Sequence, residues 1–378
     1  MAVISLGNLD KNLIPIIIGC VFCFLNRLLN QYEGTKLFEN VILTNLFIFF
    51  GGFFTIIPLI ILKVRAKRVY SSTITNKIDN QTELIYTNPK YRIIIGKWKF
   101  FVLSSVISFL ESILYVVTFP VKTNVWIWFI VFSSIFSIFF YKEKLYKQHF
   151  LIIIFIILIG LIIDLVLENL QNDFSNNNGW LLLMCFFRVI ILSLNYVIMK
   201  YTMENKFCSI YEVNTYVCLI VFLFYGIFLL IDYYFFGLYN YEEYFNSFNW
   251  MELLVVLAVL ITQLVMGLCV LNTNKYYSPC HVFIIFVFGQ FANYINLSEK
   301  YSIIIIICLL FMLFFSLIFN EIIEINFWGL SFNTRRKIIE RAKSEIEEKY
   351  LLVKNETIEP NTEATEQIKE LNDTVIYY

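Results

Sequence analysis

The chain has 378 residues, of which 59% are hydrophobic and only 15% are charged, and its mean hydropathy is +0.71. Soluble domains carry roughly 45–50% apolar and about 25% charged residues, so this composition excludes a soluble globular protein. Lys plus Arg and Asp plus Glu both total 29, and this zero net charge gives no indication of a nucleic-acid partner. The composition indicates a protein whose solvent is lipid.

Ten apolar runs follow one another along the chain. A transmembrane helix needs about 20 mainly apolar residues, and the runs are continuous rather than alternating, which favours helices over a barrel. The sequence therefore predicts an all-α integral membrane protein with ten transmembrane helices. The predicted spans lie near residues 13–31, 38–62, 98–118, 123–141, 149–167, 180–200, 211–236, 251–272, 280–297 and 301–319.

Lys and Arg are distributed unevenly between the two sides of this topology. With both termini in the cytosol, 24 of the 29 bases lie on the cytosolic side and three on the other side. The positive-inside rule therefore favours a cytosolic N-terminus at 1–12, a basic cytosolic loop at 65–97 and a cytosolic tail at 328–378. The plasma membrane, Golgi, endoplasmic reticulum and vacuole are all compatible with this pattern.

Charge pairing within the tail predicts a surface helix at 331–352, followed by an acidic, disordered end. Three glycosylation patterns begin at Asn80, Asn355 and Asn372. The topology places all three in the cytosol, so we expect them to carry no sugar.

A short internal repeat relates the two halves of the chain. Glu143-Lys144 precedes the fifth predicted span and Glu299-Lys300 precedes the tenth, at an offset of 156 residues. Each half has five spans, an odd number, so the two copies would be inverted in the membrane, as in many secondary transporters. The predicted five-helix repeats are 13–168 and 169–327. We interpret the repeated charged residues as structural, because an acid near a helix N-terminus is favoured by the helix dipole.

The first copy of this turn reads Lys142-Glu143-Lys144-Leu145, and the apolar run after it contains Gly160. It resembles the Gly-Glu-Arg/Lys-Leu turn of the drug/metabolite transporter superfamily, the ten-helix group that includes EamA-type exporters and nucleotide-sugar transporters. Lys142 stands where the family has Gly, and the second copy, Ser298 to Tyr301, is more degenerate. The resemblance implies a ten-helix carrier with two inverted repeats, and it does not single out a subfamily.

Charge inside a membrane span is costly and usually faces the protein interior, and three ionisable residues stand out in the predicted spans. Glu111 shares a helical stripe with Ser104, Ser108, Tyr115 and Thr118. The stripe predicts the lining of a substrate path, in which Glu111 either pairs with an arginine or exchanges a proton. The alternative is an ion pair that only holds helices together.

Two arginines complete this set. Arg188 shares a face with Asn195, and Arg27 follows Cys20 and Cys23 on its own helix. We expect both arginines to attract an anionic group in the path, although Arg27 lies close enough to its helix end to reach the headgroups instead. Gln263, Gln290 and Asn293 are lesser candidates for the path, because amides also serve as hydrogen-bond partners between helices.

The cysteines and histidines give no sign of a cofactor. The eight cysteines fall in or beside apolar runs, and Cys20-x-x-Cys23 lacks a second pair or a nearby histidine, so we interpret it as helix packing. His149 and His281 are too few for a histidine-box enzyme. We expect no cofactor, no metal and no nucleic-acid partner; the expected partners are the bilayer and a small-molecule substrate, with a homodimer as one option for assembly.

These observations favour a secondary transporter of a small metabolite, an anionic one if the arginines line its path, working by alternating access. No Walker-type phosphate loop is present, so a gradient or exchange would drive it. A channel or membrane sensor on the same bundle is the main alternative. A membrane-embedded lipid enzyme is a weaker one, and a heptahelical receptor would require three fewer spans.

Overall fold

The computed structural model describes the helical body of the chain and two short strands. The described residues are 4–6, 13–30, 41–64, 97–118, 125–142, 145–170, 179–206, 208–236, 250–294, 299–325, 341 and 344. Almost all of them are helical, so the predicted helical architecture is confirmed. The helices are α1 (Ile14–Asn30), α2 (Val41–Phe53), α6 (Lys97–Thr118), α7 (Trp128–Tyr141), α8 (Lys147–Leu170), α9 (Gly179–Asn205), α10 (Ile210–Ile231), α12 (Trp250–Tyr276), α13 (Pro279–Tyr294) and α14 (Glu299–Phe319).

Three of these helices carry local irregularities at their ends. A 3-10 turn, η3 (Val125–Ile127), leads into α7, and a π-helical turn, η5 (Asp232–Phe236), extends α10. After α2 the chain turns at residues 54–55 and resumes as helix over 56–64. Thr55 stabilises this turn, because its Oγ1 donates to the Gly52 carbonyl at 2.8 Å.

Among the described residues, seven helical segments are long and apolar enough to cross a membrane. They are Asn45–Val64, Lys97–Thr118, Lys147–Leu167, Gly179–Asn205, Ile210–Tyr234, Leu253–Tyr276 and Ser302–Phe319. Three further apolar helices are shorter: Ile14–Leu29, Val125–Tyr141 and Pro279–Tyr294. Large apolar side chains such as Ile154 and Phe311 are more than half exposed, which suits a lipid solvent. The chain is therefore a multi-pass membrane protein, and the count of ten crossings stays a prediction.

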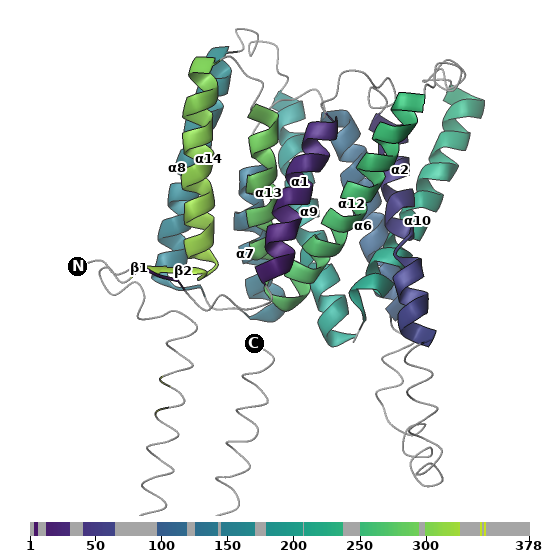
Figure 1. Cartoon of the computed structure of the whole chain (residues 1–378), viewed down its shortest axis with the longest axis horizontal. Coiled ribbons are helices and arrows are strands. Elements are labelled where there is room, and N and C mark those ends of the chain that lie inside the picture. The colour runs from purple at the N-terminus through teal and green to yellow at the C-terminus, as the bar shows by residue number, and fades with distance from the viewer. Residues whose placement is uncertain are drawn as a thin grey trace, which may run out of the picture.

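A pair of three-residue strands departs from the all-α prediction. Strand β1 (Ile4–Leu6) precedes α1, and β2 (Ile323–Ile325) follows α14; the two pair antiparallel, with Ser5 opposite Glu324. The pairing draws the beginning and the end of the helical body to the same end of the molecule (Figure 1). We call this the β end.

The packing of the body is built around α1 and α9. Helix α1 packs against α12 and α13, and α9 packs against α6 and α7. Helix α2 packs against α10, and α8 and α14 lie side by side at one edge (Figure 1). Close approach needs small residues: a Cβ added at Gly19 of α1 would lie 2.7 Å from Ile285 Cδ1 of α13.

Some expectations concern residues outside the described part of the chain. These are the basic loop up to residue 96, the first repeat pair Glu143 and Lys144, and the three glycosylation patterns. The predicted tail helix at 331–352 is described only at Arg341 and Ser344. Glu299 and Lys300 are the first two residues of α14, which agrees with their predicted position at a helix start.

Candidate functional site

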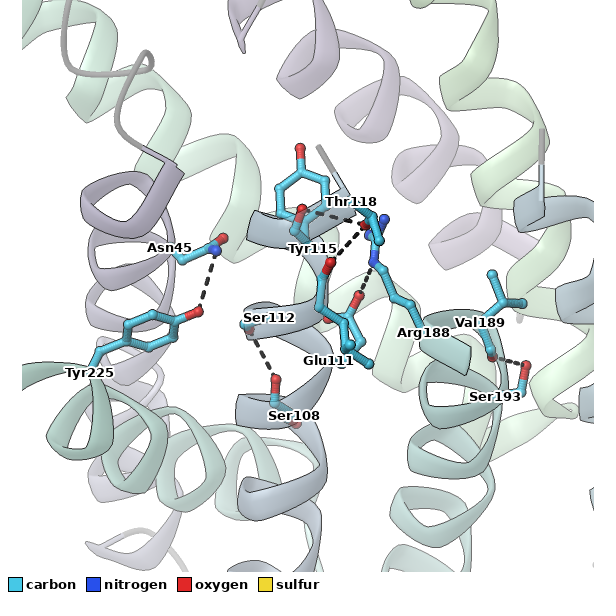
Figure 2. A network of polar contacts seen from close by, with 11 residues as sticks. Asn45, Ser108, Glu111, Ser112, Tyr115, Thr118, Arg188, Val189, Ser193 and Tyr225 are labelled. Carbon is cyan, nitrogen blue, oxygen red and sulfur yellow. Dashed lines mark hydrogen bonds and ion pairs between the residues drawn. The ribbon is translucent and has the colours of Figure 1, made fainter. Parts of the chain in front are cut away.

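Two charged residues within apolar helices, Arg188 of α9 and Glu111 of α6, form an ion pair. Arg188 Nε of α9 donates to Glu111 Oε1 of α6 at 2.8 Å, and the Arg188 guanidinium lies 4.3 Å from the centroid of the Tyr115 ring. Figure 2 shows these three side chains pointing toward one another from neighbouring helices. The side chains of Arg188 and Glu111 are 31% and 18% exposed, so the pair is largely covered by protein but still accessible to solvent. Of the two options for Glu111, the structure shows pairing.

Arg27 of α1 lies within electrostatic range of the same cluster. Its charge interacts with Tyr115, and its side chain also interacts with Cys23, one turn earlier on α1. A Cβ added at Gly289 of α13 would collide with Cys23 Sγ and lie 3.0 Å from Arg27 Nε. Glycine at position 289 therefore leaves room for the side chains of Cys23 and Arg27. Cys20 and Cys23 are buried free thiols, as helix packing predicts.

Asn195 is held in a hydrogen-bonded contact between α9 and α6. Its Oδ1 accepts from Ser104 Oγ at 2.8 Å, and its Nδ2 donates to Ser108 Oγ at 2.8 Å. Both serines belong to the predicted polar stripe of α6. The part of the stripe before Glu111 therefore packs against Asn195, and the part from Glu111 onward contacts Arg188. Both polar atoms of the Asn195 amide are therefore hydrogen-bonded to α6, and the amide joins the two helices in this conformation.

Asn26 makes the matching contact in the other half of the body. Its Nδ2 donates to Thr262 Oγ1 at 3.0 Å and joins α1 to α12. Asn26 and Asn195 are 169 positions apart in the sequence. Asn26 was not among the predicted site residues, although its recurrence as Asn195 at one offset inside the apolar runs is visible in the sequence.

A second pair of asparagines recurs at the same offset of 169, on α2 and α10. Asn45 Nδ2 donates to the Tyr225 hydroxyl at 3.3 Å (Figure 2), and Asn214 Nδ2 donates to the Gly52 carbonyl at 3.2 Å. Each asparagine therefore reaches across to the helix that carries the other. Two independent pairs at one spacing are a stronger repeat signal than the Glu-Lys turns.

The remaining amide candidates lie on α12 and α13. Gln290 is buried on α13, and its Oε1 accepts from Asn293 Nδ2 at 2.7 Å. These two side chains form a contact within one helix. Gln263 is half-buried on α12, beside the Thr262 that binds Asn26. Their place in a substrate path stays a prediction.

The two histidines lie elsewhere. His149 Nε2 is 3.7 Å from Glu321 Oε1 at the β end, and the His281 ring stacks on Tyr277 with centroids 4.8 Å apart. Within the described ranges, no group of three or more His, Cys, Asp or Glu side chains is arranged to hold a metal ion.

Comparison with family models and with curated proteins gives no relative for this chain. Its sequence matches no family model and no curated protein. The functional argument therefore depends on the geometry of the Arg188 cluster.

The charged groups of this cluster meet at Tyr115. Its side chain interacts electrostatically with Arg188, Arg27 and Glu111. The Glu111 carboxylate is already engaged by Arg188. Of the two guanidinium groups, Arg27 has no ion pair with a described carboxylate, and it is the group best placed to bind an incoming carboxylate or phosphate.

Proposed function

We propose that this chain is a secondary transporter of a small anionic metabolite, with ten membrane crossings arranged as two inverted halves, 13–168 and 169–327. The single observation that carries the proposal is the Arg188–Glu111 ion pair. It joins a helix of one half to a helix of the other, inside apolar segments where an isolated charge is costly. Intramembrane ionisable residues of this kind commonly mark a substrate path.

The strand pairing supports an even number of crossings. An odd number would put β1 and β2 on opposite faces of a bilayer whose hydrocarbon core is roughly 30 Å thick, yet they are hydrogen-bonded. Ten crossings satisfy this constraint, and seven do not. Helices α6 and α8 begin with Lys97 and Lys147, and Lys206 follows α9. The contact of His149 with Glu321 places the start of α8 at the β end. By the positive-inside rule this end is cytosolic.

The helix packing supports the inverted repeat. Exchanging the halves converts the pair α1–α12 into α9–α6, and α1–α13 into α9–α7; all four pairs are in contact. The contacts α2–α10 and α8–α14 convert into themselves, as contacts across a two-fold axis do. The asparagine pairs at an offset of 169 have the same relation, because each occupies the matching helix of the other half.

The charged residues depart from this repeat, which supports a functional role for them. At the 169-residue offset, Arg27 corresponds to Tyr196, and Arg188 corresponds to Gly19. A residue that only maintained packing would be expected to recur, as the asparagines do. The substrate needs one binding site between the halves, so the residues that recognise it need not be duplicated.

The turn after α7 supports membership of the drug/metabolite transporter superfamily. Lys142 caps α7 in the left-handed conformation, with φ 56°, and its N–H bonds to the Ile138 carbonyl. Glycine adopts this conformation without strain, and the family turn has Gly at this position. The backbone geometry therefore suits the family pattern even though the residue differs.

Ligand binding tests the proposal. Purified protein would be screened by thermal shift against carboxylates and phosphate monoesters, with uncharged analogues of matched size as controls, because a ligand raises the stability of the state it binds. We expect stabilisation by one anion class, and its loss in Arg27→Gln. Equal shifts with the uncharged analogues would refute an anionic substrate.

A further inference from the structure

A buried lysine ties three helices together at the β end. The Lys200 side chain is 7% exposed, and its Nζ donates to the Tyr277 carbonyl, just after α12, at 2.6 Å. The same Nζ lies 3.7 Å from Glu204 Oε1 and 5.0 Å from the centroid of the Tyr141 ring of α7. Lys200 belongs to α9, so one ammonium group links α7, α9 and the end of α12.

Four buried polar groups lie along the helices that meet at this lysine. They have no hydrogen-bond partner among the described residues and are at most 1% exposed; they are the side-chain oxygens of Ser133, Ser137, Thr273 and Asn274. On α7 the spacing of four residues continues from Ser137 to Tyr141, and on the α12 side from Thr273 to Tyr277. We call these four residues the polar seam. Buried polar groups are normally hydrogen-bonded, so a seam of unpaired ones needs an explanation.

Tyr196 connects the seam to the charged cluster. Its backbone carbonyl accepts from Asn274 Nδ2 at 2.8 Å, one helical turn before Lys200. Its ring packs edge-on against Phe129 of α7, and its hydroxyl interacts electrostatically with Glu111. Tyr196 therefore links the buried Asn274 of the seam, through its carbonyl, to the partly exposed cluster that contains Glu111, through an electrostatic interaction.

From this arrangement we infer that the polar seam is the cytosolic half of the substrate path in its closed state, and that Lys200 is the latch that holds it closed. The inference rests on the proposed transport function. Opening would separate α7 from α9 and the end of α12, and water would then satisfy the seam hydroxyls and the Lys200 ammonium. The unpaired groups raise the free energy of the closed state, and the Lys200 contacts lower it. Such a balance lets both states be populated.

A native thiol reports on the opening. Cys280, at the start of α13, is 4% exposed, and its Sγ lies 3.5 Å from Ser134 Oγ, next to the seam. Cys208 is 1% exposed in the connection between α9 and α10, where its Sγ donates to the Lys206 carbonyl at 3.7 Å, and it serves as the comparison thiol for general unfolding. Labelling by a membrane-impermeant maleimide added at the β end, resolved by mass spectrometry, would follow both thiols in the full chain.

Lys200→Met should speed labelling of Cys280 about tenfold or more, because the lost bonds of a charged donor raise the open population. Lys206→Met is the matched control: this lysine lies near the same end and its Nζ is 5.3 Å from the Phe100 ring. It should leave both rates unchanged. Glu204→Gln removes only the more exposed partner of Lys200, so it should increase Cys280 labelling by a smaller factor. This variant also tests the latch if Lys200→Met does not fold.

Unchanged Cys280 labelling in both Lys200→Met and Glu204→Gln would overturn the latch, as would a parallel rise at Cys208. The labelling rate depends on opening and needs no substrate. A faster Cys280 reaction without any measurable transport would therefore refute the proposed function and leave the latch standing, whereas transport with an unresponsive Cys280 would refute the latch alone.

Discussion

Replacing Arg188 and Glu111 singly and together measures how strongly this ion pair joins α6 to α9. At the observed 2.8 Å the Coulomb energy is ~6 kcal/mol for an effective dielectric constant of 20, and ~1.5 kcal/mol in bulk water. The side chains are 31% and 18% exposed, so solvent screens part of this attraction. Desolvation offsets a further part. We expect a coupling free energy of about 2 kcal/mol.

The two single variants should differ in stability. In Glu111→Gln the guanidinium keeps its position 4.3 Å from the Tyr115 ring, a contact worth about 0.5–2 kcal/mol. In Arg188→Gln the Glu111 carboxylate loses its described cationic partner altogether. We therefore expect Arg188→Gln to destabilise the protein by about 3 kcal/mol and Glu111→Gln by about 2 kcal/mol.

Equilibrium unfolding in detergent, followed by tryptophan fluorescence, would give the four free energies of the cycle. Arg188→Lys serves as a control that keeps the charge but not the planar guanidinium. A coupling below about 0.5 kcal/mol would show that the pair does not stabilise the body. A larger loss in Glu111→Gln than in Arg188→Gln would show that the Tyr115 ring does not hold the guanidinium.

Three further variants and measurements test other parts of the structure. Gly289→Ala should cost about 1–3 kcal/mol of unfolding free energy by overpacking, and Cys23→Ala should restore much of it by removing the sulfur that the new methyl group meets; no rescue would place the strain elsewhere. Lys142→Gly should raise the unfolding free energy by about 1 kcal/mol, because glycine tolerates φ 56°, whereas Lys142→Ala should not. Burial raises the pKa of the Cys208 thiol to about 11, so its alkylation rate in folded protein should increase with pH up to that value; a plateau near pH 9 would contradict this environment.

Hydropathy was sufficient to locate the helices. The predicted span at 98–118 and helix α6 differ by one residue at the start, because the apolar run itself defines the segment. The strands β1 and β2 were not predictable, since each has three residues and they come from opposite ends of the helical body. Their pairing depends on how the ten helices between them are arranged in space, and no local sequence pattern specifies this arrangement.

The sequence identified Glu111 and Arg188 separately by the cost of burying charge, but their contact spans 77 positions and required the fold. The burial of Lys200 was not predictable either. Lys200 is one of the bases on the predicted cytosolic side, and the carbonyl of Tyr277 and the ring of Tyr141 cover it. Burial of a terminal lysine by a distant turn is a tertiary effect.

The central proposal is that the protein transports an anion across the membrane by way of the Arg188 cluster, which lies between its two halves. Proteoliposomes would be loaded with an isotope-labelled pool of small carboxylates and phosphate monoesters, and the unlabelled pool would then be added outside. We expect saturable efflux of one labelled class, accelerated by its unlabelled counterpart and lost in Arg188→Gln protein that remains folded. Efflux no faster than from protein-free vesicles, or an ohmic current that does not saturate, would contradict the claim.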